Sequence, residues 1–226
     1  MKKIVTASKV SVIIPAYNEA DIIDKTLKNL SFDWINEIIV VNDGSRDDTR
    51  NYIKKYPVKL IDFKKNKGKG KDVEKALKQV EGDIIVLIDA DLGCSVKEIK
   101  KLVKPIINGK ADITIANIPV KKGGVGLVRT LADRGLQYIS GHKMRAPLSG
   151  QRAFRCQLID TVLPLSSGFG LEIGMDLDLI NSKYQVREID CDFKHKTTGH
   201  SIKGYLHRGR QFLAILKTLW KKRGLR

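Results

Sequence analysis

The stretch GDIIVLIDADL, residues 82–92, joins an apolar run at 84–88 to two carboxylates, Asp89 and Asp91. An apolar run without polar interruption is typical of a strand that is buried on both faces, as in a parallel sheet covered by helices. If the strand continued through Asp91, side-chain alternation would point both carboxylates the same way. Charges at the end of such a strand indicate a functional site at the edge of the sheet.

Apolar strands and amphipathic helices alternate along the first half of the chain. Strands are predicted at 10–16, 36–43, 58–63, 83–90 and 111–117, and helices at 20–30, 46–56, 70–80 and 95–109. This alternation predicts an α/β fold with a mostly parallel central sheet flanked by helices. The second half is less regular, with helices expected near 127–140, 168–183 and the C-terminus and strands within 146–155 and 185–193. Since no repeat or linker interrupts the chain, we expect one domain over residues 1–226.

The chain is strongly basic, with 42 Lys and Arg against 25 Asp and Glu and a net charge of +17. Ten of the basic residues and none of the acidic ones lie between residue 193 and the C-terminus. Such a charge attracts nucleic acid, anionic lipid or phosphorylated small molecules. Nucleic-acid binding is one alternative function, but aromatic residues make up only 6% of the chain and no RRM, KH or zinc motif is present. We therefore expect no nucleic-acid partner.

Cysteine usage and hydropathy bear on the compartment. Cys94, Cys156 and Cys191 are odd in number and far apart, which is typical of a reduced cytoplasmic protein. No apolar run approaches the roughly 18–20 residues that a membrane-spanning helix needs. The chain is expected to be cytoplasmic, either free or peripheral on the inner face of the membrane.

Polar residues also follow the first two predicted strands. Pro15, Tyr17 and Glu19 come after the first strand, and Asp43 comes after the second. Any one of these segments could be a turn or a helix cap. Ligands of open α/β sheets bind beyond the carboxyl ends of the strands, however, and three strand ends that each carry a carboxylate favour a ligand site.

A divalent cation and a phosphate would suit this edge. Asp89 and Asp91 repel each other unless a cation lies between them, and Mg²⁺ or Mn²⁺ prefers such oxygen ligands. The segment KKNKGKGKD, residues 64–72, places Lys69 between glycines at a predicted helix start, which favours a bound phosphate. A phosphohydrolase is a second alternative, although its paired aspartates usually follow the first strand and here follow the fourth.

Four segments together resemble family 2-type glycosyltransferases with the GT-A fold: VIIPAYNEADII at 12–23, VVNDGSRDDT at 40–49, NKGKGKDVEKAL at 66–77 and GDIIVLIDADL at 82–92. The resemblance implies a metal-dependent transferase that uses a nucleoside diphosphate sugar, UDP-linked, with a hexose such as glucose. It implies that residues 1–117 bind this donor, with Asp43 at the base and Asp91 and Asp89 at a Mg²⁺ or Mn²⁺ ion. The donor residues so implied are Pro15, Tyr17, Glu19, Asp43, Lys69, Asp89 and Ala90.

In the second half, APLSGQRAFR at 146–155 resembles two groups of such enzymes, and GFGLEIGMDLDLI at 168–180 and DFKHK at 192–196 are most similar to the second of them. These groups are the polyprenyl-phosphate glycosyltransferases and the glucosyl-3-phosphoglycerate synthases. The resemblance implies that residues 118–202 bind the acceptor and that His195 completes the metal site beside Asp89 and Asp91. Glu172 is implied to lie near the transferred sugar, and Glu172 and Asp176 are the candidate bases beside the catalytic Asp91. The acceptor residues so implied are Gly124, Ser149, Gly150 and Arg152.

The acceptor stays open between a phosphorylated small molecule and a polyprenyl phosphate. In GGVGLVRTL, residues 123–131, Leu127 and Arg129 replace the Arg and Thr with which the phosphoglycerate enzymes grip the acceptor. The match to those retaining enzymes favours retention of configuration. The basic segment 203–226 predicts an amphipathic helix with Phe212 and Trp220 on its apolar side. This helix could contact a membrane surface, pack on the core, or join two copies into a homodimer.

Overall fold

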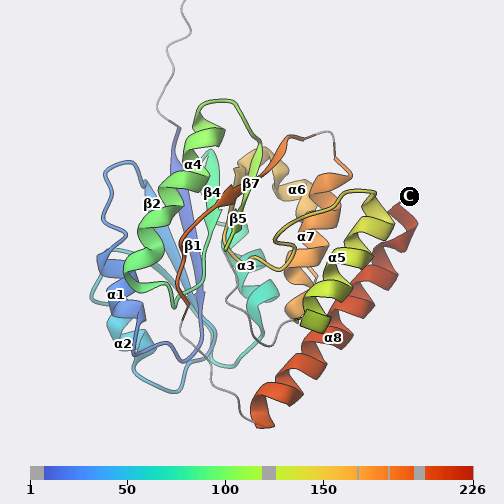
Figure 1. The fold of residues 1–226 in the computed structure, drawn as a ribbon. Helices are drawn as coiled ribbons and strands as arrows, with labels where there is room; N and C mark the ends of the chain where they lie inside the picture. Colours follow the sequence, from blue (N-terminus) through green and yellow to red (C-terminus); the bar gives the residue numbers. More distant parts are fainter. Residues whose placement is uncertain (1–7, 119–125, 167, 183, 196–201, 226) are drawn as a thin grey trace, which may run out of the picture.

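A computed structural model of the chain describes residues 8–118, 126–166, 168–182, 184–195 and 202–225. It shows a central sheet with helices on both faces, the α/β architecture that the alternating pattern predicts (Figure 1). The strands follow the order β3-β2-β1-β4-β6-β5-β7 across the sheet. They are β1 Val10–Ala16, β2 Glu37–Asn42, β3 Lys59–Asp62, β4 Ile84–Leu87, β5 Ile113–Asn117, β6 Arg152–Arg155 and β7 Val186–Asp190.

The sheet is parallel except at β6, which runs antiparallel between β4 and β5. β1 pairs with β2 and β4, β2 with β3, and β5 with β7, all in parallel. Leu87 pairs with Arg152, so the start of β6 lies beside the carboxyl end of β4. The turn before β6 therefore reaches the sheet edge where the residues after β4 lie, a juxtaposition that the local sequence pattern does not reveal.

Helices cover both faces of the sheet (Figure 1). The α-helices are α1 Ile23–Lys28, α2 Thr49–Ile53, α3 Lys69–Leu77, α4 Ile99–Ile107, α5 Gly126–Ser140, α6 Ile159–Val162, α7 Leu171–Ile180 and α8 Ile202–Lys222. The short 3-10 helices are η1 Gly93–Glu98, η2 Cys156–Leu158, η3 Gly168–Gly170 and η4 Arg223–Leu225.

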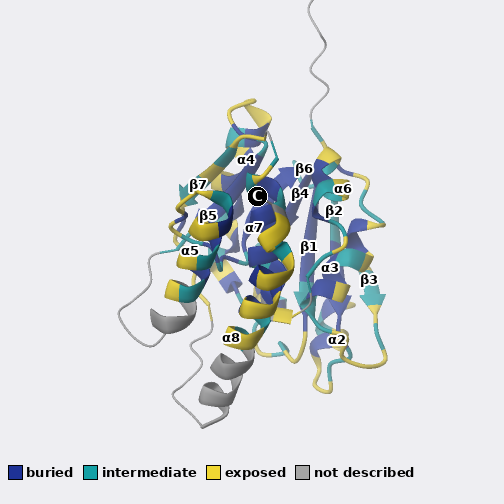
Figure 2. Ribbon diagram, turned by 90° about the vertical axis from the view of Figure 1, so that its right-hand side faces the viewer, coloured by how far each residue is buried: buried dark blue, intermediate teal, exposed yellow. Residues whose placement is uncertain are grey.

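Strand side chains alternate between two hydrophobic cores. Ile13 and Ile85 point into the core that α3, α5, α7 and α8 cover. Val12 and Val86 point into the core that α1, α2 and α4 cover. β1, β4, β5 and β6 are accordingly almost wholly buried between the helices, whereas the edge strands β3 and β7 are partly exposed (Figure 2). Burial on both faces explains why the run at 84–88 carries no polar residue.

The structure corrects two sequence predictions. β4 ends at Leu87, so Asp89 and Asp91 lie in the loop beyond it and strand alternation does not orient them. The predicted helix at 95–109 is divided into η1 and α4, and the chain turns at Gly109 with a φ of 67°. The conformation of the loop, rather than the period of the strand, sets the direction of the two carboxylates.

The C-terminal helix α8 packs on α5, α7 and η3 (Figure 1). Ile215, Thr218 and Leu219 are buried in this contact, whereas Phe212 and Trp220 are exposed. The predicted apolar stripe is thus divided between a packed side and an open side. Within the described residues, no helix is both long enough and apolar enough to cross a bilayer.

Candidate functional site

A cleft of about 430 Å³ opens at the carboxyl edge of the sheet, beyond the ends of β1, β2 and β4. Ligands of open α/β sheets bind at this edge. Its lining comes from the three strand ends, the start of α3 and the segment after β7: Pro15, Ala16, Tyr17, Glu19, Asp43, Asn66, Gly68, Lys69, Asp72, Asp89, Ala90, Asp91 and His195. The residues predicted to bind the donor and the metal thus all line one cleft.

Hydrogen bonds join the loops that follow β1 and β2. Asn18 adopts a φ of 56°, which Asn tolerates better than most residues. Its backbone N–H donates to Ser45 Oγ at 3.0 Å, and its side-chain oxygen accepts from the N–H of Arg46 at 2.8 Å. The N–H of Glu19 donates to Thr49 Oγ1 at 2.8 Å. These bonds hold together two of the loops that form the cleft wall.

Asp43, buried at the end of β2, fastens the glycine-rich loop. Its Oδ1 accepts from the N–H of Lys67 at 2.6 Å, and its Oδ2 accepts from the N–H of Gly68 at 2.9 Å. The neighbouring Gly44 has a φ of 69°, and a Cβ there would lie 2.8 Å from the backbone of Lys65. A glycine is therefore required at this turn. Asp43 consequently positions the loop as well as lining the cleft.

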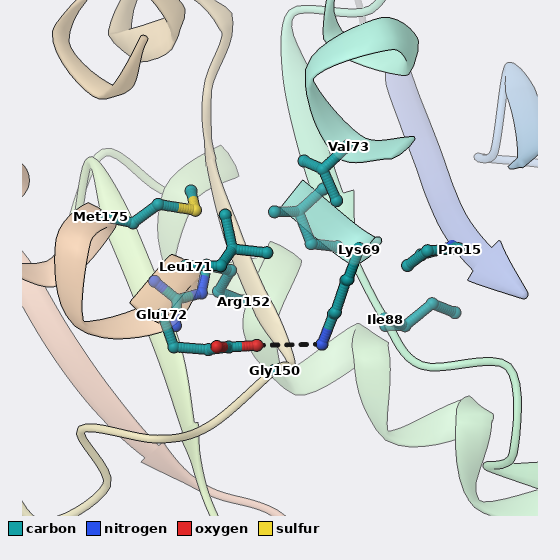
Figure 3. A pocket seen from close by; sticks show the side chains of 10 residues that line it. Pro15, Lys69, Val73, Ile88, Gly150, Arg152, Leu171, Glu172 and Met175 are labelled. Carbon is teal, nitrogen blue, oxygen red and sulfur yellow. Dashed lines mark hydrogen bonds and ion pairs between the residues drawn. The ribbon is translucent and has the colours of Figure 1, made fainter. Parts of the chain in front are cut away.

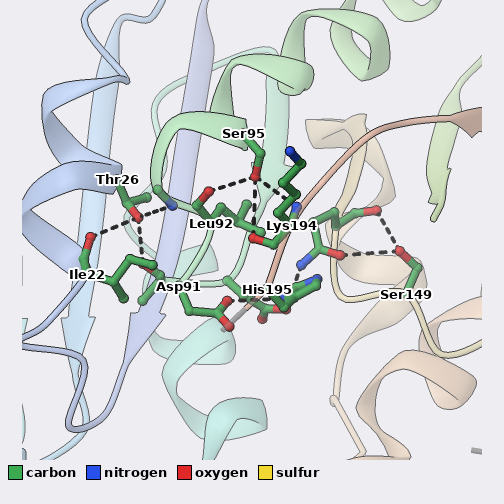
Figure 4. Close-up of polar contacts among 12 residues, drawn as sticks. Ile22, Thr26, Asp91, Leu92, Ser95, Ser149, Lys194 and His195 are labelled. Atoms are coloured by element: carbon green, nitrogen blue, oxygen red, sulfur yellow. Dashed lines mark hydrogen bonds and ion pairs between the residues drawn. The ribbon is translucent and has the colours of Figure 1, made fainter. Parts of the chain in front are cut away.

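Asp89, Asp91 and His195 form a cluster whose ligand atoms all lie within 4.8 Å of one another. His195 Nδ1 lies 3.0 Å from Asp91 Oδ1, and this hydrogen bond raises the pKa of His195 (Figure 4). Two carboxylates and an imidazole are a donor set that suits Mn²⁺ or Mg²⁺. The three predicted ligands therefore fit a divalent cation by both their chemistry and their proximity.

The segment after β7 carries His195 to this cluster because η1 holds it. The N–H of Lys194 donates to Ser95 Oγ at 2.9 Å (Figure 4). The N–H of Asp192 donates to Glu98 Oε2 at 2.8 Å. Since η1 directly follows the loop of Asp91, one short helix positions both sides of the cluster.

Asp89 lies between a cation and an amide. Its Oδ1 accepts from Lys69 Nζ at 2.7 Å, and its Oδ2 accepts from Gln151 Nε2 at 2.6 Å. Burial alone would raise the pKa of Asp89, but the positive charge of Lys69 and these hydrogen bonds hold it below its ordinary value. Each oxygen keeps a second lone pair, so a metal ion can still bind.

Lys69 also pairs with Glu172 Oε1 at 3.0 Å, which joins α3 to α7 (Figure 3). Burial would lower the pKa of Lys69, but the charges of Asp89 and Glu172 raise it above its ordinary value. A permanent cation thus lies between the two halves of the site. Lys69 thereby links Glu172 to Asp89 of the metal cluster, and the place of Glu172 near the transferred sugar stays a prediction.

Gly150 allows the turn before β6 to approach Asp89 closely. A Cβ at this position would lie 2.7 Å from Asp89 Oδ2 and 2.8 Å from Lys69 Nζ. This close approach is sufficient reason for a glycine at position 150, whether or not an acceptor binds there. It also brings the predicted acceptor residues Ser149 and Gly150 next to the metal cluster.

Arg152 and Asp176 are buried against each other, with side chains 1% and 0% exposed. Arg152 Nη1 donates to Asp176 Oδ1 at 2.8 Å, and Arg152 Nη2 donates to the carbonyl of Ser149 at 2.6 Å. Asp176 therefore cannot reach an acceptor in this structure, and its predicted role as a base is not supported. Arg152 likewise holds the turn in place, and it lines a small pocket with Gly150 and Glu172, so its role at the acceptor stays a prediction. The predicted acceptor residue Gly124 lies outside the described residues.

Asn66, Asp72 and Gln151 belong to the site but were not predicted. Gln151 stands within the segment 146–155 that carried the resemblance, and its contact with Asp89 depends on the antiparallel pairing of β6. Asp72 follows Lys69 by three residues, so a helix beginning near Lys69 places both on one side. This three-residue spacing from Lys69 is the sequence signal that could have identified Asp72 as a site residue.

Comparison with known proteins agrees with this geometry. Residues 11–160 match the family model described as glycosyl transferase family 2. A dolichol-phosphate mannosyltransferase from Pyrococcus furiosus is 35% identical over 218 residues, covering 87% of this chain. The chain spans 60% of the length of that relative. A UDP-N-acetylglucosamine–dolichyl-phosphate N-acetylglucosaminyltransferase from Methanococcus voltae is 30% identical over 169 residues, which is 63% of this chain and 67% of that protein.

Among solved structures, the chain is similar to glucosyl-3-phosphoglycerate synthase from Mycobacterium tuberculosis in complex with Mn²⁺, UDP-glucose and phosphoglyceric acid. The TM-score is 0.81 at 25% identity, and the match covers 96% of this chain and 80% of the synthase. The mixed sheet and its flanking helices are thus those of the GT-A fold.

Proposed function

The chain belongs to glycosyl transferase family 2, and on this basis we propose that it transfers a hexose from a nucleoside diphosphate sugar, UDP-linked, to a phosphorylated acceptor. The observation that carries the proposal is the cluster of Asp89, Asp91 and His195 on the wall of a cleft large enough for such a donor. The family and this cluster favour transfer over hydrolysis by a paired-aspartate phosphohydrolase.

Asp89, Asp91 and His195 would hold Mg²⁺ or Mn²⁺ on the donor diphosphate. A bound divalent ion supplies Lewis-acid neutralisation of charge on the departing diphosphate. The chain adds Lys69, whose ammonium lies in contact with Asp89 and would stabilise the same charge. A fixed cation in a partly buried site needs little reorganisation as the charge develops.

Glu172 is the carboxylate that we assign to the reacting sugar. Its side chain is 13% exposed and pairs with Lys69, on the side of the cluster where the turn before β6 lies. A fixed carboxylate stabilises the positive charge of an oxocarbenium-like transition state. Because Lys69 engages Glu172 and Asp176 is buried, this arrangement suits charge stabilisation better than proton abstraction.

A lipid-linked phosphate is the acceptor that we favour, because α8 offers a surface for an anionic membrane. Four apolar side chains are exposed on this helix: Phe212 at 37%, Leu213 at 66%, Leu216 at 40% and Trp220 at 62%. Exposed lysines at 217 and 221 accompany them. An apolar face with flanking cations and no acidic residue is typical of helices that lie in the membrane interface.

Sedimentation with vesicles tests the membrane contact. We expect binding to phosphatidylglycerol vesicles and little binding to phosphatidylcholine vesicles, and we expect Leu213→Glu to abolish the former. Tyr138→Glu, at an exposed position on α5, is the matched control and should bind normally. Equal binding by Leu213→Glu would refute the contact, and a shift from dimer to monomer in that variant would assign the face to a homodimer.

A donor screen tests the transferase proposal itself. UDP-glucose, GDP-mannose and dTDP-glucose are titrated with Mn²⁺ while melting temperature and slow donor hydrolysis are followed. We expect one of them to stabilise the wild type and to have no effect on Asp91→Ala. Asp192→Ala, at an exposed position beyond β7, should respond as the wild type does. If no nucleotide sugar stabilises the wild type, the proposal is wrong.

A further inference from the structure

Asp72 is a buried carboxyl group on the wall of the donor cleft that the proposed reaction leaves without a role. Asp72 is 2% exposed and lies on α3, three residues after Lys69. Its Oδ1 has no hydrogen-bond partner within the described residues. A buried polar atom without a hydrogen-bond partner destabilises the folded chain. Such an atom in a cleft wall indicates a place where a ligand completes the hydrogen bond.

Asp72 shares its end of the cleft with Asp43. Burial, the charge of Asp43 and a hydrogen bond shared with Asp43 raise the pKa of Asp72 to about 7, while the charge of Lys67 opposes them. Two adjoining carboxyl groups retain one proton between them. At neutral pH and below, the pair therefore offers one O–H donor beside carboxylate lone pairs. The other charged groups that line the cleft are Glu19, Lys69, Asp89, Asp91 and His195.

We propose that Asp72 determines specificity for the donor nucleobase by reading, together with Asp43, a ring N–H and the carbonyl beside it. Asp43 accepts the ring N–H. Neutral Asp72, whose hydrogen bond joins it to Asp43 when the cleft is empty, turns its single O–H to the carbonyl oxygen of the base. Both oxygens of Asp43 already accept from the backbone of the glycine-rich loop, but each has a second lone pair for the base. The inference rests on the proposed function and names the class of nucleobase in the sugar nucleotide that the chain would use.

Uracil and guanine carry this edge, whereas cytosine and adenine do not. Cytosine and adenine present a ring nitrogen without hydrogen beside an amino group. The ring nitrogen would face the carboxylate of Asp43, so two hydrogen-bond acceptors would meet, and the amino group would face the O–H of Asp72, so two hydrogen-bond donors would meet. A site built to make hydrogen bonds rejects a ligand that leaves its buried groups unpaired. The pair should therefore select a uracil or guanine nucleotide over a cytosine or adenine nucleotide.

Calorimetric titration of UDP, CDP and GDP at fixed Mg²⁺, at pH 6 and pH 8.5, tests the inference. UDP and CDP differ only in the base edge, so the ratio of their affinities cancels phosphate and metal contributions. At pH 6 we expect UDP or GDP to bind the wild type at least about tenfold more tightly than CDP, as one lost hydrogen bond implies. At pH 8.5 this preference should fall, because Asp72 is then ionised.

Two variants separate base reading from a structural role. Asp72→Asn keeps a hydrogen-bond donor, the amide N–H, that does not titrate. The preference of this variant for UDP or GDP over CDP should therefore be the same at both pH values. Asp72→Ala should lose about tenfold of the preference at pH 6. If Asp72→Ala does not fold, the pH response of Asp72→Asn still decides, since a preference that falls with pH as in the wild type overturns the inference.

The outcomes also distinguish this inference from the proposed function. Equal affinity of the wild type for UDP, GDP and CDP overturns the inference but leaves glycosyl transfer intact. Failure of all three nucleotides to bind overturns the proposed function, and the inference with it. Tight binding of UDP alone assigns uracil, and tight binding of GDP alone assigns guanine; both outcomes support the inference.

Discussion

Asp72→Asn should stabilise the folded chain at pH 8 and leave its stability unchanged near pH 4. Burial is the main reason that the pKa of Asp72 is raised from its ordinary 3.8 to about 7. The folded chain therefore holds this proton more tightly than the unfolded chain, so stability is lost as pH rises from about 4 to about 7. One pKa unit corresponds to about 1.4 kcal/mol, which makes the loss up to about 4 kcal/mol. An amide has no charge and avoids this loss.

Urea unfolding of the wild type and Asp72→Asn between pH 4 and pH 8.5 measures the effect. The gap in the free energy of unfolding should open from near zero to about 4 kcal/mol, or about 8–16 °C in melting temperature for a chain of this length. Asp192→Asn, at an exposed position, should show no gap that changes with pH. A gap that is constant across this range, or a variant less stable than the wild type at pH 8, would refute the reasoning.

The charge of Asp43 is the second cause, and it can be tested separately. Asp43→Asn removes the neighbouring negative charge, so the pKa of Asp72 should move back toward its ordinary value. The loss of stability should then begin and end at lower pH. A carboxyl group that lowers stability at neutral pH, yet lines a ligand cleft, is the combination expected where function opposes stability.

Three further predictions concern the site and its support. Gly150→Ala should weaken Mn²⁺ binding at least about tenfold, measured by calorimetry, because its Cβ would lie within 2.8 Å of the Asp89 carboxylate and the Lys69 ammonium. Gly224→Ala is the control and should bind Mn²⁺ normally, since a Cβ there would have no atom within 4 Å. Asp91→Asn should abolish Mn²⁺ binding without lowering the melting temperature of the metal-free protein by more than a few degrees. Arg152→Met should lower the free energy of unfolding by about 3–5 kcal/mol because it leaves Asp176 buried without its cation, and adding Asp176→Leu should recover most of the loss.

The donor side of the site could be predicted because it is built from local sequence. Each strand end carries its own ligand-facing residues, and parallel strands bring their carboxyl ends to one edge without further information. Pro15, Tyr17, Glu19, Asp43 and Asp89 therefore line one cleft, as expected. The location of His195 was predictable only from a family resemblance, since its contact with Asp91 spans half of the chain.

The acceptor side depended on tertiary structure. Arg152 and Asp176 have the residue types of a polar site, and only the tertiary structure shows that they are buried against each other and that Arg152 supports the turn before β6. Gln151 reaches Asp89 because β6 inserts antiparallel beside β4, a pairing that no local pattern specifies.

By itself, the sequence determined the α/β layers, the edge on which the site lies and the residue types of the metal cluster, because hydrophobic period and strand direction act over short distances along the chain. Tertiary structure alone decided which polar residues are free to meet a ligand. Burial and pairing arise where distant segments pack. There the same residue type lies in the candidate metal cluster at 91, pairs with a buried arginine at 176, and lines the cleft with an unpartnered oxygen at 72.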